Sequence, residues 1–267
     1  MFECDGNFNT ENSLQYRLLI EIGGNYYSYA VIDAGNKLKS ISYKNVPLLS
    51  NLENEAVLKL PYKNTLISLN TSHFTFIPTT VYNQNQKTAF TQFINTAPID
   101  TVFTHTLLNN QITALNTYNQ NQLEAIQNVF PSANICPQYL PFIESTFKQF
   151  KAILGTQLLL NLQFNYLELL ILHDGELQFY NVFNCLNNDE MLYYTLLACK
   201  KNNIKPQNVT LRVCGKINPD TAAYQQLNAI FTDIRITKTN AIYVNSAEFK
   251  NIEPHKFFSL LSLIICE

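Results

Sequence analysis

Residues 18–35 read LLIEIGGNYYSYAVIDAG, and residues 158–175 read LLLNLQFNYLELLILHDG. At a constant offset of 140 residues most positions agree in kind, and five pairs are identical: Leu18 and Leu158, Leu19 and Leu159, Asn25 and Asn165, Tyr26 and Tyr166, Gly35 and Gly175. Each copy has the pattern of a strand, a tight turn, a long apolar strand, a glycine turn and a third strand. A unit used only twice predicts a two-lobed protein built by duplication, because a solenoid needs three or more repeats. The two first turns would then face each other across a cleft, where a ligand could bind.

The composition is that of an ordinary globular protein. The chain has 267 residues, of which 46% are hydrophobic and 14% charged, and this length suits one large or two smaller domains. The net charge is −2 and the pI is near 6.1, with basic side chains scattered singly along the chain. Such a charge gives no long-range attraction to a polyanion, so we expect no direct nucleic-acid partner.

The sequence carries no recognisable targeting signal. It begins MFECDGNFNTENS, which lacks the basic and apolar regions of a signal peptide. The longest apolar runs, at 167–172 and 257–265, are shorter than the roughly 20 residues that span a bilayer. We therefore expect a cytoplasmic protein without membrane contact.

The cysteines form no metal-binding or redox motif. There are six, without a CxxC pair and without a histidine at zinc-finger spacing: Cys4, Cys136, Cys185, Cys199, Cys214 and Cys266. The pattern predicts buried free thiols in a reducing compartment.

Hydrophobic periodicity and turn residues predict two similar halves. In the first half, strands are expected at 16–23, 25–33, 37–44, 66–70, 74–77, 101–107, 112–116 and 134–136. Helices are expected at 86–95, 120–130 and up to residue 150, with a polar helical or irregular stretch at 49–59. In the second half, strands are expected at 157–163, 165–173, 177–183, 209–214 and 233–236. This order predicts an α/β protein with mixed sheets, its first lobe at 1–152 and its second at 153–267.

Three helices are expected in the second half. In NNDEMLYYTLLACKKNN (187–203), Asn187 or Asn188 can cap the helix, while acidic residues begin it and lysines end it. A second helix is predicted to open with Asn218 as cap and Pro219 in its first position. A closing helix at 254–266 has almost no polar face, so we expect it to be buried and able to pack across the lobes.

The duplicated order resembles the actin-like ATPase (ribonuclease H-like) fold of actin, sugar kinases and the large heat-shock chaperones. Ile20–Gly24 resembles the first phosphate-binding turn of that superfamily, and residues 160–165 occupy the place of the second. Residues 211–216 look like the adenosine-binding strand, and 261–265 look like the run in the last helix.

The full length more narrowly resembles an uncharacterised bacterial family with a degenerate actin-like fold. The segment HFTFIPTTVY (73–82) and the ending PHKFFSLLSLIICE (254–267) carry this resemblance. It implies a vestigial nucleotide cleft, whose cofactor-binding candidates would be Glu21, Gly23, Gly24, Gly215 and Lys216, together with Asn161, Gln163 and Phe164.

The sequence departs from the superfamily where the triphosphate would bind. A triphosphate needs closely approaching backbone N–H groups, hence glycine, and Mg²⁺ held by a carboxylate. In the second turn Asn161 replaces the acid, and Gln163, Phe164 and Asn165 replace the glycines, so that the Phe164 ring would obstruct or fill the cleft. Glu21 keeps a carboxylate but is one methylene longer than Asp. These changes predict a protein without a bound cofactor.

Each candidate also has a purely structural interpretation. Glu21 could be a polar strand residue that faces solvent or a backbone donor, and Gly23 and Gly24 could only make a hairpin turn with Asn25. Lys216 could bind an anion or simply lie on the surface. Turn geometry alone explains Asp33 and Asp174 as turn formers and Gly35 and Gly175 at positive φ. The four histidines, His73, His105, His173 and His255, share no metal spacing, so we expect no metal site and no catalytic residue.

Three hypotheses for function remain open. The first is a non-catalytic actin-like protein, a scaffold or regulatory subunit that binds another protein or itself as a homodimer. The second is a nucleotide binder, a weak ATPase or kinase that uses Glu21 and the cleft. The third is a sensor of another small molecule in a cleft lined by Tyr26, Tyr27 and Phe164.

Overall fold

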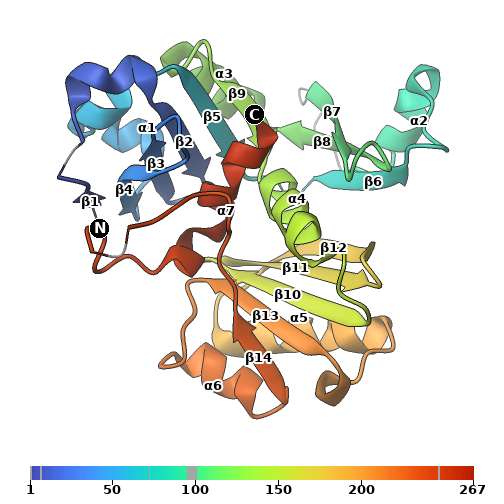
Figure 1. Ribbon diagram of the computed structural model, residues 1–267. Helices are drawn as coiled ribbons and strands as arrows, with labels where there is room; N and C mark the ends of the chain where they lie inside the picture. The colour runs from blue at the N-terminus through green and yellow to red at the C-terminus, as the bar shows by residue number, and fades with distance from the viewer. Residues whose placement is uncertain (1, 7, 72, 95–100, 246) are drawn as a thin grey trace. The chain divides into compact units, whose positions relative to one another are not determined.

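The computed structural model describes residues 2–6, 8–71, 73–94, 101–245 and 247–267 (Figure 1). The chain divides into two compact units. Unit 1 consists of Met1–Glu144, Ala241–Ile252 and Ser259–Glu267, and unit 2 of Ser145–Asn240 and Glu253–Phe258. The first junction thus lies before the predicted one at 152/153, and two C-terminal segments that we expected in the second lobe belong to unit 1.

The main sheet of unit 1 has the strand order β1-β4-β3-β2-β5-β9 (Figure 1). Its strands are β1 (Phe2–Cys4), β2 (Arg17–Ile22), β3 (Tyr27–Ile32), β4 (Leu38–Lys44), β5 (Asn64–Leu69) and β9 (Asn134–Pro137). The pairs β1–β4, β4–β3 and β3–β2 are antiparallel, whereas β2–β5 and β5–β9 are parallel. The short strand β1 lies in the polar N-terminal stretch and was missed, because three residues carry no usable alternation.

Apolar side chains explain why these segments form the centre of unit 1. All six residues of β3 (YSYAVI) are buried, as expected for a strand that is covered on both faces. One core cluster joins β2, β3 and β5 to Leu123 and Ile126 of helix α3 (Gln120–Val129), which Asn119 caps at the backbone N–H of Gln122. The stretch predicted to be helical or irregular forms short helical pieces: α1 (Leu48–Asn51) and two 3-10 turns, η2 (Leu52–Asn54) and η3 (Ala56–Lys59).

Unit 1 also contains a second sheet of three strands in the order β6-β8-β7. Its strands are β6 (Phe74–Pro78), β7 (Thr101–Leu107) and β8 (Ile112–Tyr118), and helix α2 (Lys87–Thr91) follows β6 along the chain. The three strands were predicted, but their separate sheet was not, because periodicity does not encode which strands pair. Residues 108–110, in the turn between β7 and β8, all have positive φ, and the N–H of Leu108 donates to Glu144 Oε1 at 2.6 Å.

The sheet of unit 2 has the order β12-β11-β10-β13-β14. Its strands are β10 (Thr156–Leu162), β11 (Tyr166–His173), β12 (Glu176–Asn184), β13 (Thr210–Gly215) and β14 (Asp233–Ile236). Here β12–β11–β10 is an antiparallel meander, and β10–β13 and β13–β14 are parallel. This sheet has the same order and directions as β4-β3-β2-β5-β9 in unit 1. The mixed α/β fold and both predicted meanders are therefore confirmed.

Two helices of unit 2 pack their apolar sides on this sheet. Helix α5 (Asn188–Lys201) buries Met191, Thr195, Ala198 and Cys199, and Asn187 caps it, as expected. Helix α6 (Ala222–Asn228) starts later than predicted: Thr221 is its cap, whereas Asn218 and Pro219 lie in the preceding turn. The reason is that the Asn218 carbonyl accepts the hydroxyl of Thr221, which folds residues 218–221 into a turn.

The predicted closing helix is present in three short pieces. These are η6 (Pro254–Phe257), α7 (Phe258–Ser262) and η7 (Leu263–Cys266). Residues 257–264 are all buried, which confirms the expectation drawn from their apolar sequence. The remaining helices are η1 (Thr10–Gln15), η4 (Gln84–Gln86), α4 (Tyr139–Phe150) and η5 (Pro206–Asn208). None of the described helices has the length and apolarity needed to cross a membrane.

The turns after the second strands follow the predicted chemistry with one exception. Asp33 Oδ1 accepts the N–H groups of Gly35 and Lys37, and Asp174 Oδ1 accepts that of Gly155, so both act as turn formers. Gly175 has φ 80°, as expected. The expectation for Gly35 is wrong, because Asn36 takes the left-handed conformation at φ 60°.

Candidate functional site

The first candidate turn joins β2 to β3 in unit 1. The N–H of Gly23 donates to the Tyr26 carbonyl at 3.0 Å and closes a tight hairpin. A Cβ atom on Gly23 would lie 2.1 Å from the Tyr26 ring, whereas nothing lies within 4 Å of one on Gly24. The Tyr26 side chain therefore accounts for glycine at position 23, and no packing requirement accounts for it at position 24.

Glu21 is buried within unit 1 with 3% of its surface exposed. Its carboxylate accepts the hydroxyl of Ser28 at 3.2 Å and that of Tyr26 at 3.4 Å. Burial, and then the charge of Glu21, raise the pKa of Tyr43 to about 12. The expectation that Glu21 faces solvent is wrong, because the side chain is buried and Tyr26 and Ser28 supply hydroxyl donors.

The equivalent position in unit 2 holds an amide in place of the acid. Asn161 donates from Nδ2 to Glu168 Oε2 at 2.6 Å, and Tyr180 donates to the other carboxylate oxygen at 2.6 Å. Gln163 donates from Nε2 to Asn161 Oδ1 at 3.1 Å. All four side chains are buried. These hydrogen bonds link β10, β11 and β12.

The buried acid lies on the first strand of the meander in unit 1 and on the second strand in unit 2. Glu21 on β2 lies directly opposite Ser28 on β3, and Asn161 on β10 lies directly opposite Glu168 on β11. Glu168 was missed by the sequence analysis. The signal that could have revealed it is a single acid within the otherwise apolar run YLELLIL, because a lone buried carboxylate requires hydrogen-bond donors.

The candidates Gly215 and Lys216 lie at the end of β13 in unit 2. Gly215 has φ 84°, and a Cβ there would lie 2.1 Å from the Leu162 carbonyl oxygen and 2.6 Å from Asn161 Oδ1. The Lys216 N–H donates to the same Leu162 carbonyl at 2.5 Å, and its Nζ lies 5.5 Å from the centre of the Phe257 ring. Only glycine therefore fits at position 215, where β13 approaches the end of β10.

Phe164 lies in the turn between β10 and β11, and 58% of its surface is exposed. Its ring is not part of the core of unit 2. The turn has the same closure as the first one, since the Gln163 N–H donates to the Tyr166 carbonyl at 2.9 Å. The expectation that this ring obstructs or fills a cleft remains a prediction.

The structure thus gathers the candidates into two groups, one in each unit. In unit 1, Glu21 and Gly23 both contact Tyr26. In unit 2, Asn161 contacts Gln163 and is approached by Gly215, with Lys216 next in sequence. Nucleotide binding by these residues stays a prediction.

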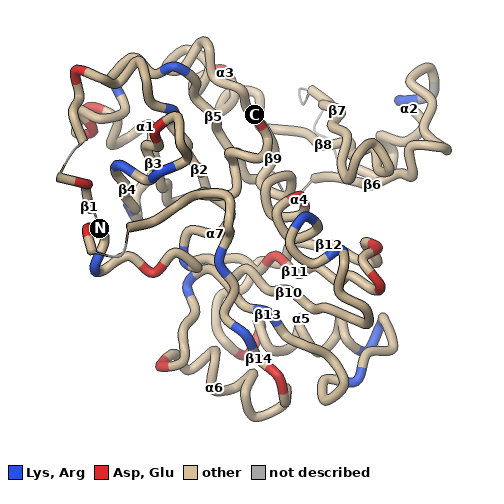
Figure 2. The backbone as a smooth tube through the Cα atoms, in the orientation of Figure 1, with Lys and Arg blue, Asp and Glu red and all other residues tan. Residues whose placement is uncertain are grey.

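The described residues contain no cluster of three or more His, Cys, Asp or Glu side chains that could hold a metal ion. His255 is buried, its Nε2 donates to the Ile217 carbonyl at 2.7 Å, and burial lowers its pKa. The six cysteines are free thiols; Cys185, Cys199 and Cys214 are buried, whereas Cys4 is exposed, unlike the expectation. Charged residues of both signs are scattered along the backbone of both units (Figure 2).

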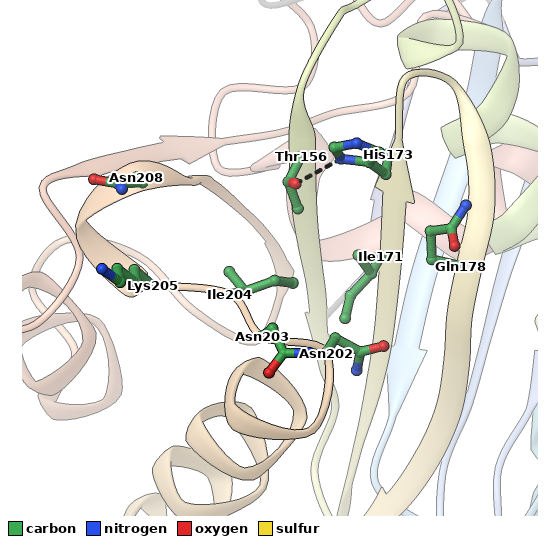
Figure 3. Close-up of a pocket in the computed structure, with 9 residues that line it drawn as sticks. All are labelled: Thr156, Ile171, His173, Gln178, Asn202, Asn203, Ile204, Lys205 and Asn208. Atoms are coloured by element: carbon green, nitrogen blue, oxygen red, sulfur yellow. Dashed lines mark hydrogen bonds between the residues drawn. The ribbon is translucent and has the colours of Figure 1, made fainter.

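A pocket of about 530 Å³ lies in unit 2, away from the candidate turn (Figure 3). Thr156 at the start of β10 and His173 at the end of β11 line it, and the Thr156 hydroxyl lies 2.9 Å from His173 Nδ1. Asn202 and Asn203 at the end of α5 lie on its other side. No local sequence pattern predicts this pocket, because the residues that line it come from four separate stretches of the chain.

The chain has the actin-like ATPase fold. A protein of Bacteroides thetaiotaomicron, described as having an actin-like ATPase fold and unknown function, matches it with a TM-score of 0.80 and 19% identity, over 98% of this chain and 100% of that chain. The PilM–PilN type IV pilus biogenesis complex contains a chain with a TM-score of 0.62 and 11% identity, over 94% of this chain and 98% of that chain. A polyphosphate/ATP-glucomannokinase from Arthrobacter matches with a TM-score of 0.43 and 11% identity, over 94% of this chain and 97% of that chain.

Within this class, the chain belongs to the protein family of unknown function DUF3822, whose model matches residues 5–234. No curated protein sequence is detectably similar to it. The resemblance to a family of unknown function with an actin-like fold is therefore confirmed.

Proposed function

We propose that this protein is a non-catalytic member of the actin-like fold that acts in the cytoplasm by binding another protein, as a scaffold or regulatory subunit. The observation that carries the proposal is the hydrogen-bonded network around Asn161, where the superfamily would have the acid of the second phosphate turn. Asn161 donates a hydrogen bond to Glu168 and accepts one from Gln163. The amide that stands in place of the acid is thus bonded to neighbouring side chains of unit 2. We attribute the shared strand order of the two main sheets to an internal duplication, after which the second copy lost its phosphate turn.

The energetics of phosphoryl transfer support a non-catalytic role. Catalysis of this reaction consists almost entirely of positioning and charge stabilisation around the phosphates. Removing one preorganised donor typically costs about 10²–10³ in rate, and here the turn has lost its glycines and its acid together. In unit 1, the carboxylate of Glu21 already accepts two hydroxyl groups.

A fold relative that is described in a protein complex supports a role in protein binding. The PilM relative, matched with a TM-score of 0.62, is described in a complex with PilN. A regulatory or scaffold role needs the folded units and an exposed surface, and neither depends on the phosphate turns.

Calorimetric titration with ATP and a non-hydrolysable analogue in Mg²⁺ tests the proposal. We expect no saturable heat at micromolar protein and no thermal stabilisation. A ligand at a hundredfold excess over its Kd would add about 2.7 kcal/mol of stability, which a melting experiment detects readily. A micromolar, Mg²⁺-dependent site that disappears in Glu21→Ala would overturn the proposal.

That result would favour the second candidate, a nucleotide-binding weak ATPase or kinase. The observation in its favour is that Glu21 keeps a carboxylate on β2 and that Gly215 keeps the left-handed conformation at the end of β13. Glu21→Gln is the variant to compare with Glu21→Ala in the titration, because it removes the charge of the side chain and retains its ability to form hydrogen bonds.

A further inference from the structure

Strand β12 forms one edge of the unit 2 sheet. It is nine residues long, ELQFYNVFN, and among the described strands it pairs only with β11 (Figure 1). An open edge exposes alternate main-chain N–H and C=O groups, which can pair with another strand. Long open edges are therefore usually covered or protected.

The equivalent edge in unit 1 is covered. Strand β4 occupies the place of β12, and β1 pairs along it with Phe2 opposite Ser42 and Cys4 opposite Ser40. The N–H of Asp5 extends this pairing to the Lys39 carbonyl at 2.8 Å. The described part of unit 2 contains no strand in the corresponding place. The strand orders of the two main sheets therefore differ only at this edge.

The other edges of the two main sheets carry protecting residues, and β12 does not. Strand β14 is four residues long and includes Asp233 and Arg235, and β9 ends in Pro137. In β12 the single charge, Glu176, lies at the start of the strand. The remaining FYNVFN segment (179–184) has no charge and no proline, and its aromatic and β-branched residues favour strand pairing.

The hydrogen bonds show which groups face outward from β12. The N–H of Cys185 donates to the Asn165 carbonyl at 3.0 Å, so the odd-numbered residues of this segment turn their main chain toward β11. The N–H of Val182 consequently points away from β11. It donates to the side-chain oxygen of its neighbour Asn181 at 2.9 Å, as a main-chain donor does when no strand lies beside it.

We propose that β12 pairs antiparallel with β12 of a second copy of this chain and joins the two unit 2 sheets into one. This rests on the proposed protein-binding role and names one partner for it. A twofold axis through the sheet makes the pairing antiparallel and self-complementary. With Asn181 opposite itself, Phe179 lies opposite Phe183 of the second copy, an aromatic cross-strand pair.

Charge favours a second copy as the occupant. In this register Glu176 lies beyond the end of the opposing segment, so no like charges face each other. The partly buried side chains of Phe179, Val182 and Phe183 become more deeply buried on pairing. When the strands pair, the N–H of Val182 exchanges the side-chain oxygen of Asn181 for a main-chain carbonyl of the opposing strand.

Charge-swapped variants test the proposal. We expect the unaltered protein to sediment as a dimer at tens of micromolar, and both Asn181→Lys and Asn181→Glu to sediment as monomers, because each places two like charges opposite each other. Mixing the two variants should restore a dimer that contains one of each. The mixture serves as the folding control, since misfolded variants would not recombine. Gln207→Lys, at an exposed site on η5, adds the same charge elsewhere and should remain dimeric.

The proposal is overturned if the unaltered protein remains a monomer up to about 100 µM, which corresponds to an association free energy weaker than roughly 5.5 kcal/mol. It is equally overturned if the dimer persists in Asn181→Lys, or if the mixture of swapped variants stays monomeric. These outcomes are independent of the ATP titration, so failure of the edge pairing and failure of the non-catalytic role can be told apart.

Discussion

Glu21 and Asn161 occupy the same position in two sheets of the same order, yet their surroundings differ. Glu21 is an acid that hydroxyl groups surround, whereas Asn161 is an amide bonded to an acid on the next strand. In both units the buried charge is satisfied by neighbouring side chains, as burial of a carboxylate requires. Gly215 is constrained more tightly than either, because both its φ and its distance to the Leu162 carbonyl require glycine.

Gly215→Ala should therefore destabilise the protein by about 2–4 kcal/mol, since alanine disfavours positive φ and its Cβ would displace β10. Denaturant unfolding measures the change. Gly24→Ala is the matched control, with no left-handed φ and nothing within 4 Å, and should change stability by less than about 0.5 kcal/mol. Equal effects of the two substitutions would refute this account of Gly215.

At the scale of one element, helix α5 shows how local sequence determines a boundary. Asn187 accepts the Glu190 N–H at 2.9 Å, and Glu190 in turn accepts the Leu186 N–H at 2.8 Å. At the other end Asn203 has φ 56°, and the N–H groups of Asn203 and Ile204 donate to carbonyls of the last turn. Both ends are thus satisfied by residues within or next to the helix.

Asn187→Ala should cost about 1 kcal/mol of stability, because it leaves the Glu190 N–H without its side-chain acceptor. Asn188→Ala is the control: it changes the next residue, which makes no capping bond, and should cost less than about 0.5 kcal/mol. Urea unfolding of the two variants side by side is the measurement. A larger loss in Asn188→Ala would contradict the assigned cap.

At the scale of the whole molecule, the end of the chain alternates between the units: residues 241–252 and 259–267 belong to unit 1, and residues 253–258 belong to unit 2. Residues 241–252 are bonded to the rest of unit 1 through Tyr243. Its N–H donates to the Asn36 carbonyl, and its own carbonyl accepts the Leu38 N–H. The end of the chain also belongs to unit 1, where Glu267 forms an ion pair with Arg17 at 3.0 Å. Unit 1 is therefore built from segments that lie far apart in the sequence.

Truncation after Glu253 should consequently give insoluble protein or protein without a cooperative unfolding transition. It removes Phe258, Leu260, Leu261 and Leu263, each with 0% exposure, and each large buried side chain contributes about 2–5 kcal/mol. Removal of Glu267 alone deletes a partly exposed ion pair and should cost at most about 1 kcal/mol. Circular dichroism melting compares the two. A soluble, cooperatively folding truncate would show that the closing segment is dispensable for the core.

The sequence by itself determined the strands of both meanders, the cap of α5 and the burial of the closing segment. These features depend on local alternation, on capping residues and on apolar runs, all of which lie close together in the chain. The resemblance to the actin-like fold rested on the same local patterns, and it is confirmed.

Only the tertiary structure decided which groups surround the candidate residues. Glu21 is buried because Tyr26 and Ser28 face it across a hairpin, and Asn161 is bonded to Glu168 because β10 and β11 pair in that register. Likewise, β1 pairs with β4 although the partners Phe2 and Ser42 lie far apart in the chain, and in the described part of unit 2 no strand pairs with the outer edge of β12. Pairing between distant segments is a property of the folded chain, since the same short strand pattern is compatible with many partners.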